Sequence, residues 1–125
     1  MAPTSRPLSP HLQIYRLSIT MAMSIAHRIT GVGLYFGTAI VAVWLAAAAL
    51  GDGPFGQVQG FFDHWFGRLL LFGYTWALFH HMLGGLRHFI WDFGAGYGMA
   101  RHWLGWATIG GSLAITAAIW LWLLV

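Results

Sequence analysis

Three long apolar segments with short polar connections between them dominate the hydrophobic pattern of the chain. No Asp, Glu, Lys or Arg interrupts residues 29–50, 69–86 and 103–125. Each segment is long enough to span a membrane, because about 20 helical residues cross a hydrocarbon core about 30 Å thick. A lone strand in lipid would leave its backbone groups unpaired, so each segment must be helical. The pattern predicts membrane-spanning helices at about 24–50, 65–91 and 103–125.

The composition agrees with an all-α membrane protein and disagrees with a soluble domain. Hydrophobic residues make up 58% of the 125 positions and charged residues only 7%, whereas soluble domains carry about 25% charged residues. A surface so poor in charge can face lipid but not water. We expect a single membrane-anchor domain over residues 1–125, in which residues 1–23 form a segment on the inner side of the membrane.

Missing residue types exclude several classes of function. The chain has no cysteine, which excludes a disulfide framework and a cysteine-ligated iron–sulfur cluster within it. The arginines occur singly, without the basic run that would indicate nucleic-acid binding. The sequence also contains no nucleophile–base triad and no carboxylate pair, and we therefore predict no catalytic residue of either kind.

The arginines indicate which side of the membrane each connection occupies. Five of the six lie before or at the start of the first span, or flank the second connection: Arg6, Arg16, Arg28, Arg87 and Arg101. These two regions share one side, and positively charged residues accumulate on the inner side. The N-terminus is therefore expected in the cytoplasm or the mitochondrial matrix, and the C-terminus outside.

A polar stripe opens the first span and consists of Ser24, His27, Arg28 and Gly31. Their i, i+3, i+4, i+7 spacing puts them on one face of a helix. A hydroxyl, an imidazole and a guanidinium thus lie together at the inner edge of the bilayer. A simpler interpretation is that Arg28 reaches the lipid headgroups and serves only the topology.

A second polar stripe closes the second span, with His81, Gly84, Gly85 and His88 at the same spacing. His81 lies six residues before Arg87 and therefore about 9 Å deeper in the membrane. A buried imidazole at that depth indicates a functional site.

Two interpretations of this stripe stand. His81 is either an axial haem ligand, with the glycines leaving room for the macrocycle, or a partner in an interhelical hydrogen bond. His80 is the competing ligand, but it faces about 100° away from the glycine stripe.

The two stripes and the N-terminus together resemble a known family. The stretches RPLSPHLQIY, SITMAMSIAHRITG and HHMLGGLRHFIWD, within residues 6–31 and 81–92, are similar to the cytochrome b subunit of succinate dehydrogenase (respiratory complex II). The first stretch looks most like mitochondrial and alphaproteobacterial members. Two departures from the family pattern are the doubled histidine His80–His81 and the paired glycines Gly84–Gly85, of which the second matches.

The resemblance implies a role for each polar stripe. His81 matches the axial ligand of haem b and its iron, His27 and Arg28 match residues near the haem propionates, and Ser24 and Arg28 match the ubiquinone pocket. The family also implies a bundle with a second small membrane-anchor subunit, which supplies the other axial histidine. An iron–sulfur subunit and a flavoprotein subunit on the inner side would carry out succinate oxidation, a reaction that this chain alone could not perform.

The localisation that the resemblance implies is a bacterial or mitochondrial inner membrane. Two alternatives to a succinate dehydrogenase anchor remain. One is the anchor of a fumarate reductase or another membrane cytochrome, and the other is a membrane scaffold without redox function.

Overall fold

The computed structural model describes residues 16–124, which form four helices and no strand. The helices are α1 (Ile19–Leu50), α2 (Asp52–Asp63), α3 (Trp65–Asp92) and α4 (Ala100–Leu124). Three of them, α1, α3 and α4, are long and apolar enough to cross a membrane. The predicted three-span all-α fold is confirmed. Arg6, the RPLSPHLQIY stretch and Val125 lie outside the described residues.

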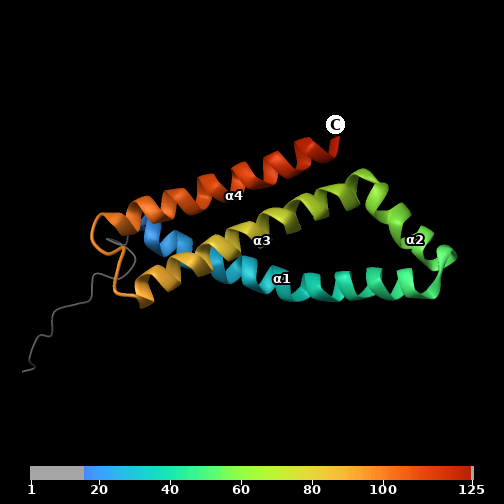
Figure 1. The fold of residues 1–125 in the computed structure, drawn as a ribbon, viewed down its shortest axis with the longest axis horizontal. Helices are drawn as coiled ribbons and strands as arrows, with labels where there is room; N and C mark the ends of the chain where they lie inside the picture. Colours follow the sequence, from blue (N-terminus) through green and yellow to red (C-terminus); the bar gives the residue numbers. More distant parts are fainter. Residues whose placement is uncertain (1–15, 125) are drawn as a thin grey trace, which may run out of the picture.

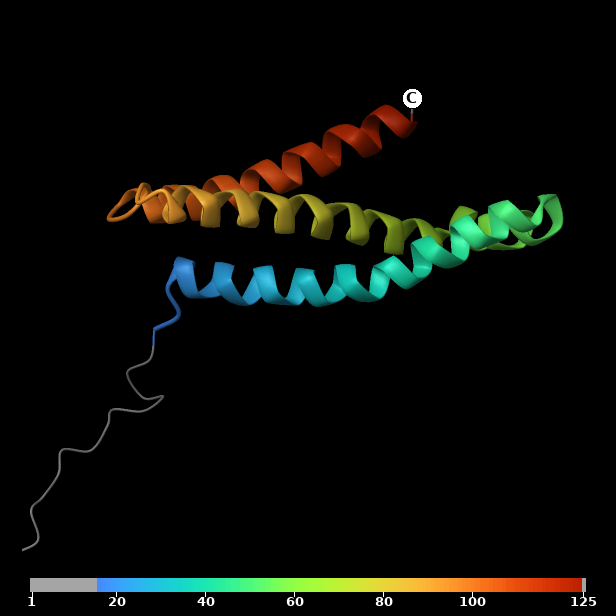
Figure 2. The same ribbon diagram turned by 60° about the horizontal axis from the view of Figure 1, so that its bottom comes forward.

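Helix α3 lies between the other two long helices (Figures 1 and 2) and packs against both of them. The start of α1, the end of α3 and the start of α4 gather at one end of the molecule, while α2 caps the opposite end. We call the first of these the arginine-rich end, because its segments carry Arg16, Arg28, Arg87 and Arg101. This arrangement agrees with the predicted sidedness of the connections but does not by itself orient the chain in a membrane.

Two of the long helices extend beyond their predicted starts. Helix α1 begins at Ile19, one turn before residue 24, because Ser18 caps it: the Ser18 Oγ accepts a hydrogen bond from the Met21 N–H at 3.4 Å. Helix α4 begins at Ala100 rather than 103. The additional turns lie outside the apolar windows, where hydropathy alone carries no signal for a helix.

The first connection is largely helical, which the sequence analysis did not predict. Helix α2 contains Gly53, Pro54, Gly56 and Gly60, residues that weaken a helix interior. Pro54 is tolerated because it falls in the first turn, where the missing N–H has no intrahelical partner. Tertiary contacts stabilise the helix despite these residues: Phe62 is buried, and Gln59 accepts a hydrogen bond from the Trp44 indole at 3.4 Å.

Glycines at two points let neighbouring segments approach closely. A Cβ on Gly37 of α1 would overlap the ring of Tyr74 in α3, and a Cβ on Gly67 would overlap the backbone at Phe61 and Phe62. Gly67 thus permits the sharp turn from α2 into α3, where His64 caps the new helix through its Nδ1, 3.4 Å from the Phe66 N–H. Small residues perform this role widely between membrane helices.

Candidate functional site

The structure brings the two predicted stripes into contact through His27 of α1 and His81 of α3. The two imidazole rings are stacked, with centroids 3.9 Å apart and planes only 6° from parallel. Both side chains are half-buried. The contact joins residues 54 positions apart in the chain, and it lies toward the arginine-rich end of the α1–α3 interface.

Two reciprocal hydrogen bonds lock the stacked rings. The His27 Nε2 lies 3.2 Å from the His81 carbonyl oxygen, and the His81 Nδ1 lies 3.0 Å from the His27 carbonyl oxygen. A carbonyl oxygen can only accept, so each of these ring nitrogens must carry the proton and donate. The Thr30 hydroxyl, 3.4 Å from the His81 Nδ1, donates to the Ala26 carbonyl at 2.8 Å and offers that nitrogen a second acceptor.

This hydrogen bonding leaves the other nitrogen of His81 available. Because Nδ1 holds the proton, Nε2 of a neutral His81 carries a free lone pair. Nε2 makes no hydrogen bond with any residue from 16 to 124, and it is not an enclosed atom. A histidine that donates one ring N–H to a carbonyl and keeps the other nitrogen accessible has the usual arrangement of a metal ligand. The interhelical hydrogen bond expected of His81 is therefore present at Nδ1, and Nε2 stays available for the other interpretation, an axial ligand.

His80 faces a different neighbour. It is 2% exposed, and its Nδ1 lies 3.3 Å from the Ser112 Oγ of α4. The Ser112 hydroxyl donates to the Ile109 carbonyl at 2.9 Å, so its oxygen accepts from His80. The remaining His80 nitrogen, Nε2, is enclosed and has no hydrogen-bond partner among the described residues. His80 thus joins α3 to α4, and no open space adjoins its free nitrogen.

The two adjacent glycines of α3 have different surroundings. A Cβ on Gly84 would overlap Cδ2 of the His27 ring and lie 3.2 Å from its Nε2. A Cβ on Gly85, four residues after His81 on the same face, would meet no atom within 4 Å. Gly84 therefore allows α1 to approach, whereas Gly85 leaves open space on the face of α3 that it shares with His81. A flat macrocycle bound near this face would need such space.

The predicted quinone residues, Ser24 and Arg28, remain outside the helix interface. Ser24 is half-buried and Arg28 is exposed, and neither makes a hydrogen bond or ion pair with any part of the chain that the structure describes. The residues of the polar stripe on α1 therefore have two different environments. His27 and Gly31 contact α3, and Ser24 and Arg28 keep their polar groups available to a ligand or a second protein.

Arg87 is a buried charge that the sequence analysis used only as a marker of topology. It is 2% exposed, its guanidinium lies 4.9 Å from the centre of the Trp91 ring, and its Nε and Nη1 lack hydrogen-bond partners within residues 16–124. His80, Gly84 and Arg87 have i, i+4, i+7 spacing and are all buried. That spacing was a signal in the sequence for the interior face of α3.

His88 of the second stripe lies close to the same pair of rings. The imidazole of His88 lies 5.2 Å from the His27 ring and 5.2 Å from the Trp91 ring, measured between centroids. Three histidine rings consequently gather at this end of the α1–α3 interface.

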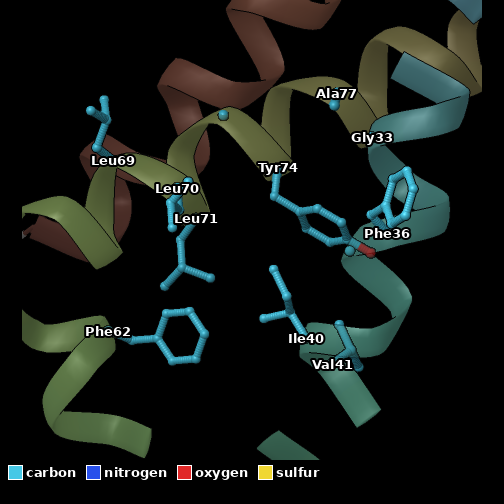
Figure 3. A pocket seen from close by; sticks show the side chains of 12 residues that line it. Gly33, Phe36, Ile40, Val41, Phe62, Leu69, Leu70, Leu71, Tyr74 and Ala77 are labelled. Atoms are coloured by element: carbon cyan, nitrogen blue, oxygen red, sulfur yellow. The ribbon is translucent and has the colours of Figure 1, made fainter. Parts of the chain in front are cut away.

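An apolar cavity of about 330 Å³ lies between α1 and α3, away from the histidines and bounded by α2 (Figure 3). Its lining includes Phe36, Ile40, Phe62, Leu70 and Tyr74, and the Tyr74 side chain points toward α1. It offers packing surface and, apart from the Tyr74 hydroxyl, no group that could ligate a metal or donate a proton. The chemistry of this chain therefore concentrates around His27 and His81.

Comparisons with known proteins identify the family of this chain. A family model for the succinate dehydrogenase/fumarate reductase transmembrane subunit matches residues 2–124. The succinate dehydrogenase cytochrome b556 subunit of Paracoccus denitrificans is 42% identical over 114 residues, which are 89% of this chain and 86% of that protein. The corresponding subunit of Rickettsia felis is 37% identical over 92% of this chain and 90% of its own length.

A mitochondrial relative extends the comparison. The succinate dehydrogenase cytochrome b560 subunit of Sus scrofa is 40% identical over 98 residues, which are 74% of this chain and 56% of the longer mitochondrial protein. Bacterial and mitochondrial relatives thus each match most of this chain, and the resemblance found in its motifs is confirmed. The chain belongs to the family of succinate dehydrogenase/fumarate reductase transmembrane subunits, membrane components of an oxidoreductase complex.

Proposed function

We propose that this chain is a membrane anchor of a succinate:quinone oxidoreductase, in which His81 ligates haem b and Ser24 and Arg28 help to form the ubiquinone-reduction site. The haem assignment rests on the different roles of the two nitrogen atoms of the His81 ring. Its Nδ1 donates to the His27 carbonyl at 3.0 Å, while its Nε2 makes no hydrogen bond among the described residues and is not enclosed. The residues present therefore fit a haem bound through His81 Nε2, and Gly85, where a Cβ would meet no atom within 4 Å, adds room on the same face of α3.

Haem b, when bound, would hold one electron between the iron–sulfur subunit and the quinone. This chain's residues then have distinct tasks. His81 supplies one axial nitrogen, and the partner anchor subunit supplies the other. Arg28 lies at the arginine-rich end, where a propionate could accept a hydrogen bond from its guanidinium. His27 would lie near the same propionate, while its Nε2–H donates to the His81 carbonyl. The names of the relatives, cytochrome b556 and b560, support a haem in this chain.

Ser24 and Arg28 suit a quinone that gains negative charge on reduction. The Ser24 hydroxyl can donate to a quinone carbonyl oxygen, and Arg28 supplies a permanent positive charge. Both are expected at the inner edge of the bilayer, beside the low-dielectric hydrocarbon, where such a charge stabilises a developing oxyanion more strongly than it would in water. Neither side chain is engaged by another described residue, so both are free to contact a substrate.

The proposal includes three protein partners in an inner membrane. The second small anchor subunit would pack against the exposed faces of α1 and α3. The iron–sulfur subunit and the flavoprotein subunit would dock on the inner side and carry out succinate oxidation. Proton uptake would then come from the inner aqueous phase.

We expect a purified membrane complex containing this chain to show the bands of a b-type haem in a reduced-minus-oxidised spectrum. Mass spectrometry should identify a flavoprotein, an iron–sulfur protein and a second small membrane protein that purify with it. Faster turnover of fumarate than of succinate would favour the fumarate reductase alternative. A complex of full composition without b-type bands would overturn the haem assignment, and a chain that purifies alone without haem would indicate a scaffold.

We also expect the N-terminus on the inner side and the C-terminus outside, because the arginine-rich end carries four described arginines against Arg68 alone at the other end. A reporter enzyme that is active only outside should be active when fused to Val125. The matched fusion within the α3–α4 connection at Gly94 should be inactive. The reverse pattern, at equal expression, would invert the orientation.

A further inference from the structure

We propose that His27 is a positioning residue for His81, and that Gly84 makes this possible by leaving room for the His27 ring. The inference rests on His81 being the haem ligand, as proposed above. It gives His27 a task beyond contact with a propionate. The His27 ring, its carbonyl and the bare surface of Gly84 together determine the plane in which the His81 imidazole stands.

Three contacts with α1 restrict the orientation of the His81 ring. One face of the ring is covered by the parallel His27 ring at 3.9 Å. One edge faces Gly31, where a Cβ would lie 2.8 Å from Cε1 of His81. The hydrogen bond from Nδ1 to the His27 carbonyl at 3.0 Å then sets the rotation of the ring within that space. The direction of the Nε2 lone pair follows from these contacts.

His27 is itself held by α3. Its Nε2–H donates to the His81 carbonyl at 3.2 Å, and its ring rests on Gly84, where no side chain of any size fits. A methyl group at Gly84 would overlap Cδ2 of that ring. The ring would have to move away from α3, which would break its hydrogen bond to His81 and disturb the stack.

The orientation of the ligand has consequences for a bound haem. The hydrogen bond at Nδ1 raises the basicity of the ligating nitrogen and fixes the plane of its ring. A more basic axial ligand stabilises the ferric state, so loss of this bond should raise the reduction potential of the haem. Rotation of the ligand plane should change the electron paramagnetic resonance g-values of the oxidised low-spin haem.

The test compares two glycine substitutions on the same helix, in the complete membrane complex. Gly84→Ala is expected to shift the largest g-value, because it displaces the His27 ring that stacks on His81 and holds its plane. It should also raise the haem potential if α1 moves away from α3 with that ring, because the bond from His81 Nδ1 to the His27 carbonyl then lengthens. Gly73→Ala, where a Cβ would meet no atom within 4 Å, controls for alanine in α3 and should match the unmodified complex. Gly84→Ala complexes with normal haem content, unchanged g-values and unchanged potential would reject the proposal.

A double-mutant cycle separates a steric effect on His27 from general damage to the helix. Removing the ring with His27→Ala vacates the space that the methyl group introduced by Gly84→Ala would need. We therefore expect Gly84→Ala to add no further change in the His27→Ala background, and to recover haem binding there if the single variant fails to assemble. An equal effect of Gly84→Ala in both backgrounds would show that His27 does not transmit it.

Together with His81→Ala, the cycle distinguishes failure of this inference from failure of the proposed function. If His81→Ala retained the haem signal, the ligand assignment itself would fail. If His81→Ala removed the signal but Gly84→Ala and His27→Ala acted independently, the ligand would stand and only its positioning by His27 would fail.

Discussion

Replacement of His81 by alanine is expected to abolish the low-spin haem spectrum of the assembled complex, whereas His80→Ala should leave that spectrum largely intact. The reason is the environment of the two free Nε2 atoms. His81 Nε2 is not enclosed, whereas His80 Nε2 is enclosed between α3 and α4. An iron atom with its macrocycle could reach the first nitrogen but not the second. The measurement is a reduced-minus-oxidised spectrum normalised to the flavin content of the complex.

The effect of His80→Ala should be on stability instead. The variant loses the hydrogen bond to Ser112, a contribution of about 0.5–1.5 kcal/mol, and leaves a cavity where the imidazole was. We expect a lower thermal midpoint for the complex with a normal haem-to-flavin ratio. The opposite outcome, a haem signal lost in His80→Ala and retained in His81→Ala, would move the ligand by one residue.

The sequence partly distinguishes His80 from His81 as the candidate ligand. Helical periodicity separates His80 from His81 by about 100° and places Gly85 on the side of His81. It does not say which side of α3 faces α1, α4 or open space. That depends on how the helices rotate against one another, which the structure supplies through Ser112 on one side and Gly31 on the other.

The stacking of His27 on His81 could not be predicted from helical periodicity. Spacing within one helix defines a face, but pairing across helices needs the register between residues 54 positions apart. The glycine that enables the pairing, Gly84, is the one that departs from the family motif, while the matching glycine, Gly85, faces open space. The family resemblance therefore implies a role for His81 but does not predict its contact with His27.

Helix α2 marks the limit of prediction from hydropathy. Its glycines and proline are typical of a loop, and its apolar residues are too few for a span. The helix forms because Phe62 is buried and Gln59 reaches Trp44 of α1. Such long-range contacts override local propensity, which is a weak determinant of structure. The three long spans were predictable because lipid permits no other backbone structure.

The second large effect concerns the quinone. Arg28→Leu is expected to slow ubiquinone reduction strongly, and Ser24→Ala to slow it less. A hydrogen bond is worth about 0.5–1.5 kcal/mol net, and about 1.5–3 kcal/mol when one group is charged. By the same scale, in which about 1.4 kcal/mol corresponds to a factor of 10 in rate, the serine variant should lose up to about 10-fold and the arginine variant about 10- to 150-fold. Steady-state ubiquinone reduction by the membrane complex measures both.

Dye-linked succinate oxidation separates a quinone effect from failed assembly. An artificial acceptor that takes electrons before the quinone should turn over normally in both variants, since the flavin site belongs to another subunit. Arg68→Leu is a matched control, because it removes an arginine from the opposite end of the molecule, beside α2, and should leave quinone reduction unchanged. Because Arg28 is exposed and has no partner among residues 16–124, its removal should not disturb the packing of α1 on α3. Normal ubiquinone kinetics in fully assembled Arg28→Leu and Ser24→Ala complexes would return Arg28 to a role in topology alone.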